Sequence, residues 1–289
     1  MVLKKSARIE RELILHESRT DIQFLKDKAL WVRKETLDIH RIAQDTRLAS
    51  SLSSVEIFVA LFYGKVLNFD PKDIRWGNRD RFIISKGHGS ISLYPILADL
   101  GFFDAGELKR VCKEGTFLGG IPDPIIPGYE TVNGSLGHGL GVGCGIALAL
   151  KRRKKSEGVF VLLGDGELYE GSVWEAVMFA GEHKLDNLIM IIDNNKVCML
   201  DYCKNVIDLE PIEEKFKSFR WAVERLDGHK ISQLYDSLLN LKENKNNKPK
   251  LLIADTIKGK GVPSLETDPL SHIKNIRPED IDKVIEGLR

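Results

Sequence analysis

The chain has 289 residues, of which 43% are apolar and 29% charged, and its formal net charge is +1. That length exceeds the usual size of one domain but suits a single large α/β domain with a substantial core. The near balance of charge gives no electrostatic case for nucleic acid or an anionic membrane as the partner. A small acidic cofactor remains compatible, because a local site does not need a basic surface.

The terminal and cysteine patterns indicate a cytoplasmic protein. No segment approaches the roughly 20 apolar residues of a membrane span. The start, MVLKKSARIERELILHESRTD, is charged throughout and lacks the apolar core of a signal peptide. The cysteines form no CxxC pair, so we expect reduced thiols that act as small buried hydrophobes, at Cys112, Cys144, Cys198 and Cys203.

Apolar spacing predicts helices in alternation with short strands. Residues 21–44 have helical spacing, and residues 53–67 form a second predicted helix, with Ser53 as N-cap and Glu56 completing a capping box. Further helices are expected over 90–103, over 134–156 after a glycine-rich start, and over 171–184, and strands over 80–85, 159–163, 188–192 and 250–257.

This alternation predicts an α/β fold. Strands that are continuous apolar runs imply a parallel sheet covered by helices on both faces. We expect residues 1–20 to be a charged lead-in and residues 21–289 to form a single domain. The linker-like stretch KENKNNKPK, residues 242–250, is too short to divide domains and joins a helix to a strand.

One segment, GDGELYEGSVWEAVMFAGEHKLDNLIMIIDNN (164–195), indicates a cofactor site. A strand ends near Asp165, a helix crosses over, and the next strand ends near Asn195, which places both side chains at one sheet edge, where ligands of open α/β sheets bind. Gly164 and Gly166 allow the backbone to approach a diphosphate closely. Carboxylate and amide oxygens are hard ligands that suit octahedral Mg²⁺.

The pattern GDG followed by NN resembles the thiamine diphosphate motif, and residues 21–275 resemble transketolases of the split-gene kind. The resemblance includes RDRFIISKGHGS, GSLGHGL, LEPIEEKFKSFRW, DGH and DTIKGKGV. It implies a thiamine-diphosphate-binding α/β fold. Rival phosphate motifs fail, because GLGVGCG has no G-x-G-x-x-G register and no G-x-x-x-x-G-K-[ST] occurs.

The resemblance also implies ligands. Asp165 and Asn195 would hold Mg²⁺, or Ca²⁺ or Mn²⁺, by their side chains and Val197 by its carbonyl. The cofactor-binding residues implied are Gly134 and Leu136 at the ring pocket, Gly164, Asp165, Gly166 and Glu167 around the diphosphate, and Asn195, Val197 and His272. On the residues alone, Asp165 also suits a helix N-cap and Asn195 a plain turn.

Four residues are implied in catalysis. His88, His138 and His272 match positions near the reacting centre, where they would shuttle protons or donate hydrogen bonds, an effect of about 10²–10⁴-fold in rate. Glu170 matches a glutamate at the subunit interface that links two active sites. The alternatives are ordinary structural histidines and a first-turn carboxylate favoured by the helix dipole. Lys258 would belong to a solvated turn or bias the site toward phosphate.

Two positions depart from the family pattern. Arg47 and Ile121 stand where ketose-using transketolases have histidines that handle donor hydroxyls. The run LASSLSSVE also resembles deoxyxylulose phosphate synthase, a relative whose donor is pyruvate. The sugar donor expected from the family is therefore in doubt, and a 2-oxo acid donor is an alternative.

The resemblance further implies a two-subunit enzyme. Full-length transketolases continue into a domain that binds the aminopyrimidine ring, and no segment here matches it, so we expect a separate partner subunit that carries it. The implied activity is cleavage of a C–C bond beside a carbonyl and transfer of the two-carbon unit to an aldehyde. Alternatives are the α subunit of a 2-oxo acid dehydrogenase and a non-catalytic relative.

Overall fold

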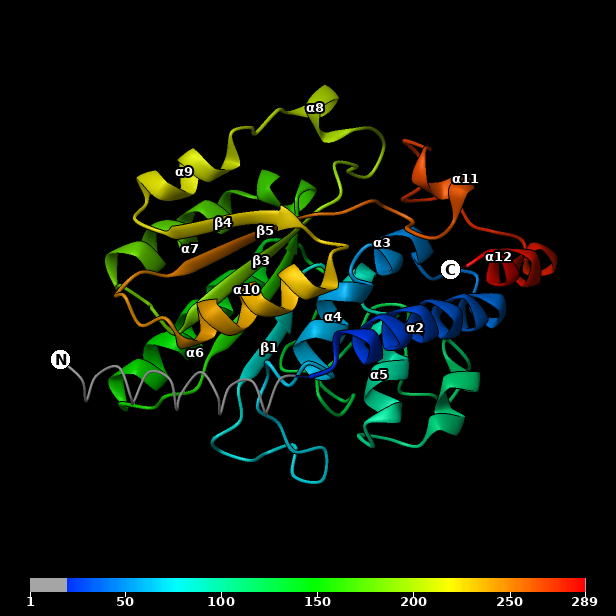
Figure 1. Ribbon diagram of the computed structural model, residues 1–289, viewed down its shortest axis with the longest axis horizontal. Coiled ribbons are helices and arrows are strands. Elements are labelled where there is room, and N and C mark those ends of the chain that lie inside the picture. The colour runs from blue at the N-terminus through cyan, green and yellow to red at the C-terminus, as the bar shows by residue number, and fades with distance from the viewer. Residues whose placement is uncertain (1–19, 289) are drawn as a thin grey trace.

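The computed structural model describes residues 20–288 and contains one five-stranded sheet (Figure 1). Every strand pair is parallel, and the strand order is β1-β2-β3-β5-β4. The charged lead-in expected over residues 1–20 lies, except for its last residue, outside the described residues. The strands are β1 (Arg81–Ile84), β2 (Val159–Gly164), β3 (Leu188–Asn194), β4 (Ala222–Asp227) and β5 (Lys250–Asp255).

Helices cover both faces of the sheet, as predicted. Side chains of β1, β2, β3 and β5 alternate between two cores, one shared with α2, α4, α5 and α10 and the other with α6, α7 and α9 (Figure 1). The α-helices are α2 (Ile22–Ile42), α3 (Leu48–Leu52), α4 (Val55–Phe62), α5 (Leu93–Asp99), α6 (His138–Arg152), α7 (Gly171–Glu182), α8 (Cys203–Val206), α9 (Ile212–Ser218), α10 (Ile231–Glu243), α11 (Pro263–Glu266) and α12 (Ile281–Gly287). The 3₁₀ turns are η1 (Gly87–Gly89), η2 (Ala105–Arg110), η3 (Gly166–Tyr169) and η4 (Pro278–Asp280).

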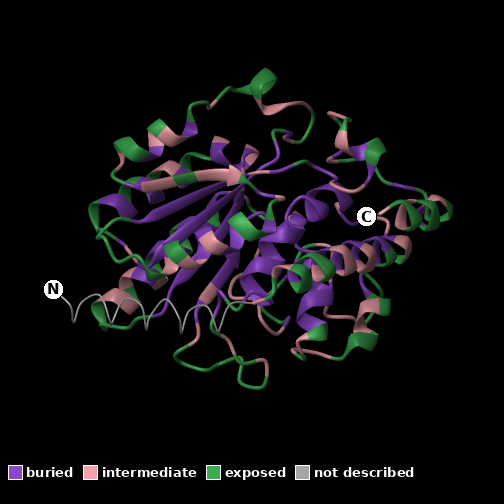
Figure 2. Cartoon of the chain, viewed as in Figure 1, coloured by how far each residue is buried: buried purple, intermediate pink, exposed green. Residues whose placement is uncertain are grey.

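The central strands are apolar because both of their faces are covered. All seven residues of β3 are buried, and Figure 2 shows the inner strands buried along their length. Strand β4 lies at an edge and exposes Glu224 and Asp227, so its sequence AVERLD lacks the apolar run of the other strands. For that reason the sequence analysis missed it.

The predicted helix over 53–67 is wrong at both ends, because α4 covers only Val55–Phe62. The chain forms the short helix α3, bends, and begins α4 at Val55. Ser53 is not the N-cap of α4, a position that Ser54 occupies, and its hydroxyl donates to Asp193 at 2.6 Å. Glu56 does not complete a capping box either, since its carboxylate binds Arg33 and accepts from His229 Nδ1 at 3.0 Å. Both residues serve tertiary contacts instead.

The structure tests two further expectations, namely that the cysteines are free and buried and that no segment spans a membrane. All four thiols are free, but only Cys144 is buried, so the expected burial is wrong for the other three, and Cys112 is exposed. Among residues 20–288, none of the helices combines the length and the apolar character that crossing a bilayer demands.

Candidate functional site

Polar side chains gather where the parallel strands end. Gly164 of β2 pairs with Asp193 of β3, so the residues that follow the two strands lie at the same level of one sheet edge. Asp165 follows β2 directly, and Asn195 follows β3. The predicted juxtaposition of these two residues is therefore present in the fold.

A buried ion pair lies at the centre of this edge. The Lys86 ammonium, at the exit of β1, binds the Asp193 carboxylate of β3, and both side chains are at most 1% exposed. The ammonium also donates to Ser54 Oγ and to the Ser50 carbonyl, each at 3.0 Å. Ser53 and Ser54 both donate to Asp193, at 2.6 and 3.1 Å. The turn between α3 and α4 is thus fastened to the sheet edge.

Asp193 stays charged although it is buried. Burial alone would raise its pKa, but the charge of Lys86 and hydrogen bonds from Lys86, Ser53 and Thr256 hold that pKa at about 2. Asn195 Nδ2 also donates to this carboxylate, at 3.2 Å. Asp193 therefore orients the amide of Asn195 as well as the serine turn.

Asp165 is a second buried carboxylate with the opposite electrostatics. It accepts hydrogen bonds from the amides of Gly166, at 2.8 Å, and of Lys196, and it caps η3. Burial and the charge of Asp193 raise its pKa to about 6. Asp165 forms no ion pair within residues 20–288. A carboxylate in that state favours a cation brought from outside.

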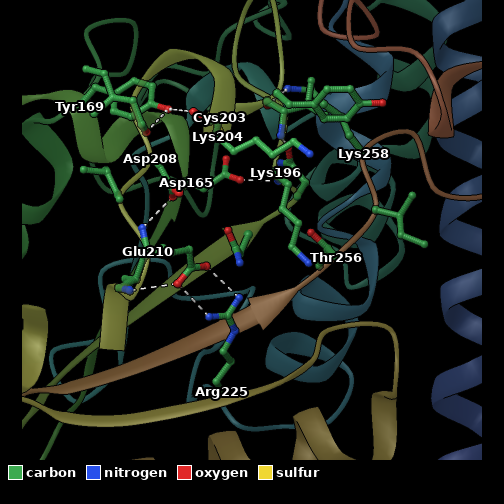
Figure 3. A pocket seen from close by; sticks show the side chains of 18 of the residues that line it. Asp165, Tyr169, Lys196, Cys203, Lys204, Asp208, Glu210, Arg225, Thr256 and Lys258 are labelled. Atoms are coloured by element: carbon green, nitrogen blue, oxygen red, sulfur yellow. Dashed lines mark hydrogen bonds and ion pairs between the residues drawn. The ribbon is translucent and has the colours of Figure 1, made fainter. Parts of the chain in front are cut away.

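Two further oxygens complete a donor set that suits such a cation. Asn195 Oδ1 accepts from the amide of Val197 at 3.2 Å, and the Val197 carbonyl accepts from Lys258 Nζ at 2.7 Å. Asp165, Asn195, Val197 and Lys258 all line one cavity of about 640 Å³ (Figure 3). Three oxygen donors with one negative charge are the ligands that Mg²⁺ takes from proteins beside diphosphate oxygens.

Lys258 is not the solvated turn residue that the sequence suggested. It is 4% exposed, and burial lowers its pKa to about 8. Its ammonium joins the Val197 carbonyl to His272 Nδ1, which lies 3.1 Å away. A positive charge is therefore already held against one of the three oxygen donors.

The predicted histidines His88 and His272 meet. Their ring centroids are 5.0 Å apart, and the rings are inclined at 59°. Because an ammonium only donates, Nδ1 of His272 accepts from Lys258, and the ring proton is on Nε2. Burial, followed by the charges of Lys258, Arg47 and Lys86, lowers the pKa of His272 to about 3. Burial and Lys86 likewise depress the pKa of His88, so both imidazoles are neutral near pH 7.

Glu167 joins the glycine-rich segments to one another. Its carboxylate accepts from the amide of Gly137 at 2.8 Å, from the amide of Gly164 at 3.3 Å and from the hydroxyl of Ser85. The Ser85 hydroxyl in turn accepts from the amide of Gly139 at 3.1 Å. Glu167 thus holds the SLGHG loop, residues 135–139, against the GDGE turn, residues 164–167, and against the end of β1. The sequence analysis did not assign this positioning role to it.

Four predicted residues lie away from the buried cluster. Gly134 and His138 are exposed, Leu136 is half-buried, and Glu170 is exposed at the start of α7. A Cβ at Gly137, where φ is +84°, would lie 2.6 Å from Glu170 Cβ, so that Glu170 borders the SLGHG loop. Ring-pocket and interface roles both require such open positions, and these assignments stay predictions.

Arg47 and Ile121, which replace histidines of the family pattern, lie near His272 and His88. Arg47 is half-buried before α3, and its charge acts on His272. Within residues 20–288, no carboxylate pairs with its guanidinium. Ile121 is 50% exposed, and its Cγ2 would lie 3.4 Å from a Cβ placed on Gly87, beside His88.

Residues 29–288 match the family described as "Transketolase, thiamine diphosphate binding domain". The chain belongs to the transketolase family. The parallel sheet with helices on both faces is accordingly a thiamine-diphosphate-binding fold, as predicted.

Individual family members resemble the chain over most of its length. One of them, a subunit of the apulose-4-phosphate transketolase of Actinobacillus succinogenes, is 38% identical over 241 residues, covering 83% of this chain and 86% of that protein. The 6-deoxy-6-sulfo-D-fructose transketolase subunit SqwG of a Clostridium species is 34% identical over 266 residues, covering 92% and 95%. The solved transketolase of Campylobacter jejuni superposes with a TM-score of 0.84 at 30% identity. That match covers 92% of this chain but only 43% of the Campylobacter transketolase.

The Lys86–Asp193 pair yields a stability prediction. Lys86→Met leaves the Asp193 charge buried without its counter-ion, which should lower the free energy of unfolding by about 3–5 kcal/mol. The double variant Lys86→Met/Asp193→Leu should be less destabilised than Lys86→Met alone. Urea unfolding measures both.

Lys217→Met is the matched control, because it removes an exposed lysine paired with Glu214 and should leave the free energy of unfolding close to that of the parent. Equal losses for Lys86→Met and Lys217→Met would contradict the central position given to the buried pair.

Proposed function

We propose that the chain is the diphosphate-binding subunit of a two-subunit, transketolase-like transferase. The enzyme cleaves a C–C bond beside a carbonyl and transfers a two-carbon ketol unit to an aldehyde, with thiamine diphosphate and Mg²⁺. The observation that carries this proposal is that Asp165, Asn195 and Val197 line one cavity at the sheet edge of a transketolase-family fold.

Each of these residues has a role in the proposal. Asp165, Asn195 and Val197 would hold the metal, and Gly164 and Gly166 would border the diphosphate. When bound, thiamine diphosphate supplies a nucleophilic ring carbon and an electron sink.

The histidines act on the substrate in this proposal. His272 carries its ring proton on Nε2 and is neutral, so it can donate a hydrogen bond to a developing alkoxide without adding a charge. His88, with its ring beside His272, would share this task. His138 would contribute from the rim of the site.

A partner subunit completes the site. Relatives that this chain covers almost entirely are named as subunits, whereas whole transketolases are more than twice as long as the match. We infer a cytoplasmic α₂β₂ heterotetramer whose second subunit carries the pyrimidine-binding domain. Its interface should be of the obligate type, above about 2,000 Å². Glu170, exposed beside the SLGHG loop, would lie in it.

The isolated chain should therefore show no turnover. Mixing it with its partner subunit should restore ketol transfer in proportion to the amount of complex, because neither half holds the whole cofactor. Size-exclusion chromatography with a coupled assay on the same fractions measures assembly and activity together. Turnover by a homogeneous preparation of this chain alone would refute the two-subunit architecture.

Asp165→Ala should abolish tight binding of thiamine diphosphate with Mg²⁺ to the assembled enzyme. The variant removes the one charged metal ligand while leaving the Lys86–Asp193 pair intact. Isothermal titration calorimetry gives the affinity. Asp282→Ala, at a side chain 75% exposed, is the control and should bind like the parent. Unchanged affinity in Asp165→Ala would remove the metal assignment.

A second candidate concerns the donor. The guanidinium of Arg47 is unpaired within residues 20–288, and its charge reaches His272. Guanidinium pairs with a carboxylate or a phosphate, and isoleucine offers no partner to a sugar hydroxyl. A sugar hydroxyl that the partner subunit buried against Ile121 would be left unpaired, at a cost of about 1–3 kcal/mol. We therefore propose a donor with less hydroxyl at the reacting end and an anionic group near Arg47, such as the 2-oxo acid pyruvate.

Donor competition tests this candidate. The assembled enzyme should use pyruvate with a higher kcat/KM than xylulose 5-phosphate, and Arg47→Gln should lower the value for pyruvate by roughly tenfold or more through KM. Arg152→Gln, at the C-terminal end of α6, is the charge-matched control. A clear preference for the ketose phosphate would contradict the anionic-donor proposal and leave the transketolase-like one standing.

A further inference from the structure

Both proposed metal ligands that follow β3 belong to one surface loop. The β3–α9 loop, residues 195–211, begins with Asn195 and Val197 and contains the short helix α8. Near its start the loop folds back on itself: Val197 forms an isolated bridge with Tyr202, and the amide of Cys203 donates to the Lys196 carbonyl at 2.9 Å. The tip is solvent-exposed, and the cavity described above lies beneath the loop.

One arginine binds the far end of this loop. Arg225, on the edge strand β4, donates through Nη2 to Glu210 at 3.0 Å and through Nη1 to Glu213 at 3.1 Å. Glu210 is the next to last residue of the loop, and Glu213 lies in the first turn of α9. Figure 3 shows Arg225 at the opposite end of the cavity from Tyr169 and Cys203.

The same guanidinium is also connected to the start of the loop, through Asp255 and Asn194. Its Nε and Nη2 donate to the two carboxylate oxygens of Asp255, at 2.8 and 3.0 Å. Asp255 in turn accepts from Asn194 Nδ2 at 2.7 Å. Asn194 directly precedes the proposed ligand Asn195, and its carbonyl accepts from the amide of Thr256 at 3.1 Å. Arg225 is therefore connected to the residues at both ends of the β3–α9 loop.

Global stability does not account for these contacts. Arg225 is 26% exposed, and its partners Glu210 and Glu213 are 45% and 25% exposed. Ion pairs in such positions contribute little to the free energy of unfolding, because water and salt screen them. Their geometry, by contrast, is demanding: a planar guanidinium satisfies three carboxylates at once, which a lysine ammonium cannot copy.

We propose that Arg225 is a positioning residue for the metal site, which clamps the two ends of the β3–α9 loop and so fixes Asn195 and Val197 against Asp165. This inference rests on the proposed function. Outer contacts that orient metal ligands are commonly worth roughly 10–100-fold in metal affinity. Among the described residues, no hydrogen bond or ion pair joins Arg225 to Asp165, Asn195 or Val197, and Arg225 lines the end of the cavity opposite Tyr169 and Cys203.

The test compares Arg225→Gln and Arg225→Lys in the assembled enzyme, with Mn²⁺ as a paramagnetic probe of the metal site in the presence of thiamine diphosphate. Arg225→Gln should weaken Mn²⁺ binding by roughly 10–100-fold, and Arg225→Lys by less. At saturating metal, kcat should return to within about twofold of the parent, since the clamp restricts the loop without taking part in the reaction. Arg220→Gln, at an exposed ion pair with Glu182, is the matched control and should behave like the parent.

A readout independent of the metal is limited trypsinolysis, because the loop contains exposed Lys196 and Lys204. Without metal, Arg225→Gln should be cut at these lysines faster than the Arg220→Gln control. Asp255→Ala should match Arg225→Gln in Mn²⁺ affinity, and the double variant should be no weaker, since both break one connection.

Parent-like Mn²⁺ affinity and parent-like cleavage in Arg225→Gln would overturn the clamp. So would a loss of affinity in Arg225→Gln that saturating metal does not reverse in kcat, because that result indicates a general structural defect. Failure of the proposed function is distinguishable, since it would appear as unchanged Mn²⁺ affinity in Asp165→Ala.

Discussion

The buried pair of Lys86 and Asp193 is the interaction on which the site depends. Two charges at most 1% exposed cannot stand alone in a sheet edge, because each would cost several kilocalories per mole of desolvation. Their mutual attraction and the surrounding hydroxyls offset that cost. In doing so they draw the α3–α4 turn, the exit of β1 and the exit of β5 to one point.

The ion pair also makes the two neighbouring carboxylates, Asp193 and Asp165, electrostatically different. Asp193 has its own ammonium, and its pKa lies at about 2, whereas Asp165 has only backbone amides and a pKa of about 6. A site that must take up a cation needs a negative charge that the protein has not already neutralised. Neither neighbouring ammonium forms an ion pair with Asp165: Lys86 binds Asp193, and Lys258 donates to the Val197 carbonyl and to His272. Burial, together with these positive charges, lowers the pKa of His88 and of His272, so both imidazoles are neutral and can donate hydrogen bonds at physiological pH.

Around this buried centre the remaining parts of the site are held by single connecting residues. Glu167 links two glycine-rich segments to β1, and Arg225 links both ends of the loop that carries Asn195 and Val197. The rim behaves differently, since His138 and Glu170 are exposed and have no such connector among the residues that the structure describes. The floor of the site is thus buried and hydrogen-bonded, whereas its rim is exposed.

The sequence by itself determined the parallel α/β fold and the placement of Asp165 beside Asn195. Continuous apolar runs between helices indicate strands covered on both faces, and parallel strands bring their carboxyl ends to one edge. The resemblance to transketolases likewise implied His88 and His272, whose rings the fold brings to within 5.0 Å of each other. Only the tertiary structure decided which partners the charged groups bind. Whether Lys258 is a solvated turn residue or a buried ammonium depends on Val197, which lies 61 residues away along the chain.

The spacing of Ser53 and Glu56 fits a local capping box. In the fold, however, Ser53 donates to Asp193, and Glu56 binds Arg33 and His229, all of them distant in the sequence. Strand β4 was not predicted, because an edge strand needs no continuous apolar run. The sequence analysis therefore also assigned no role to Arg225, which lies on β4. Local sequence fixes periodicity, whereas the choice of a charge's partner is made among groups that only the folded chain brings together.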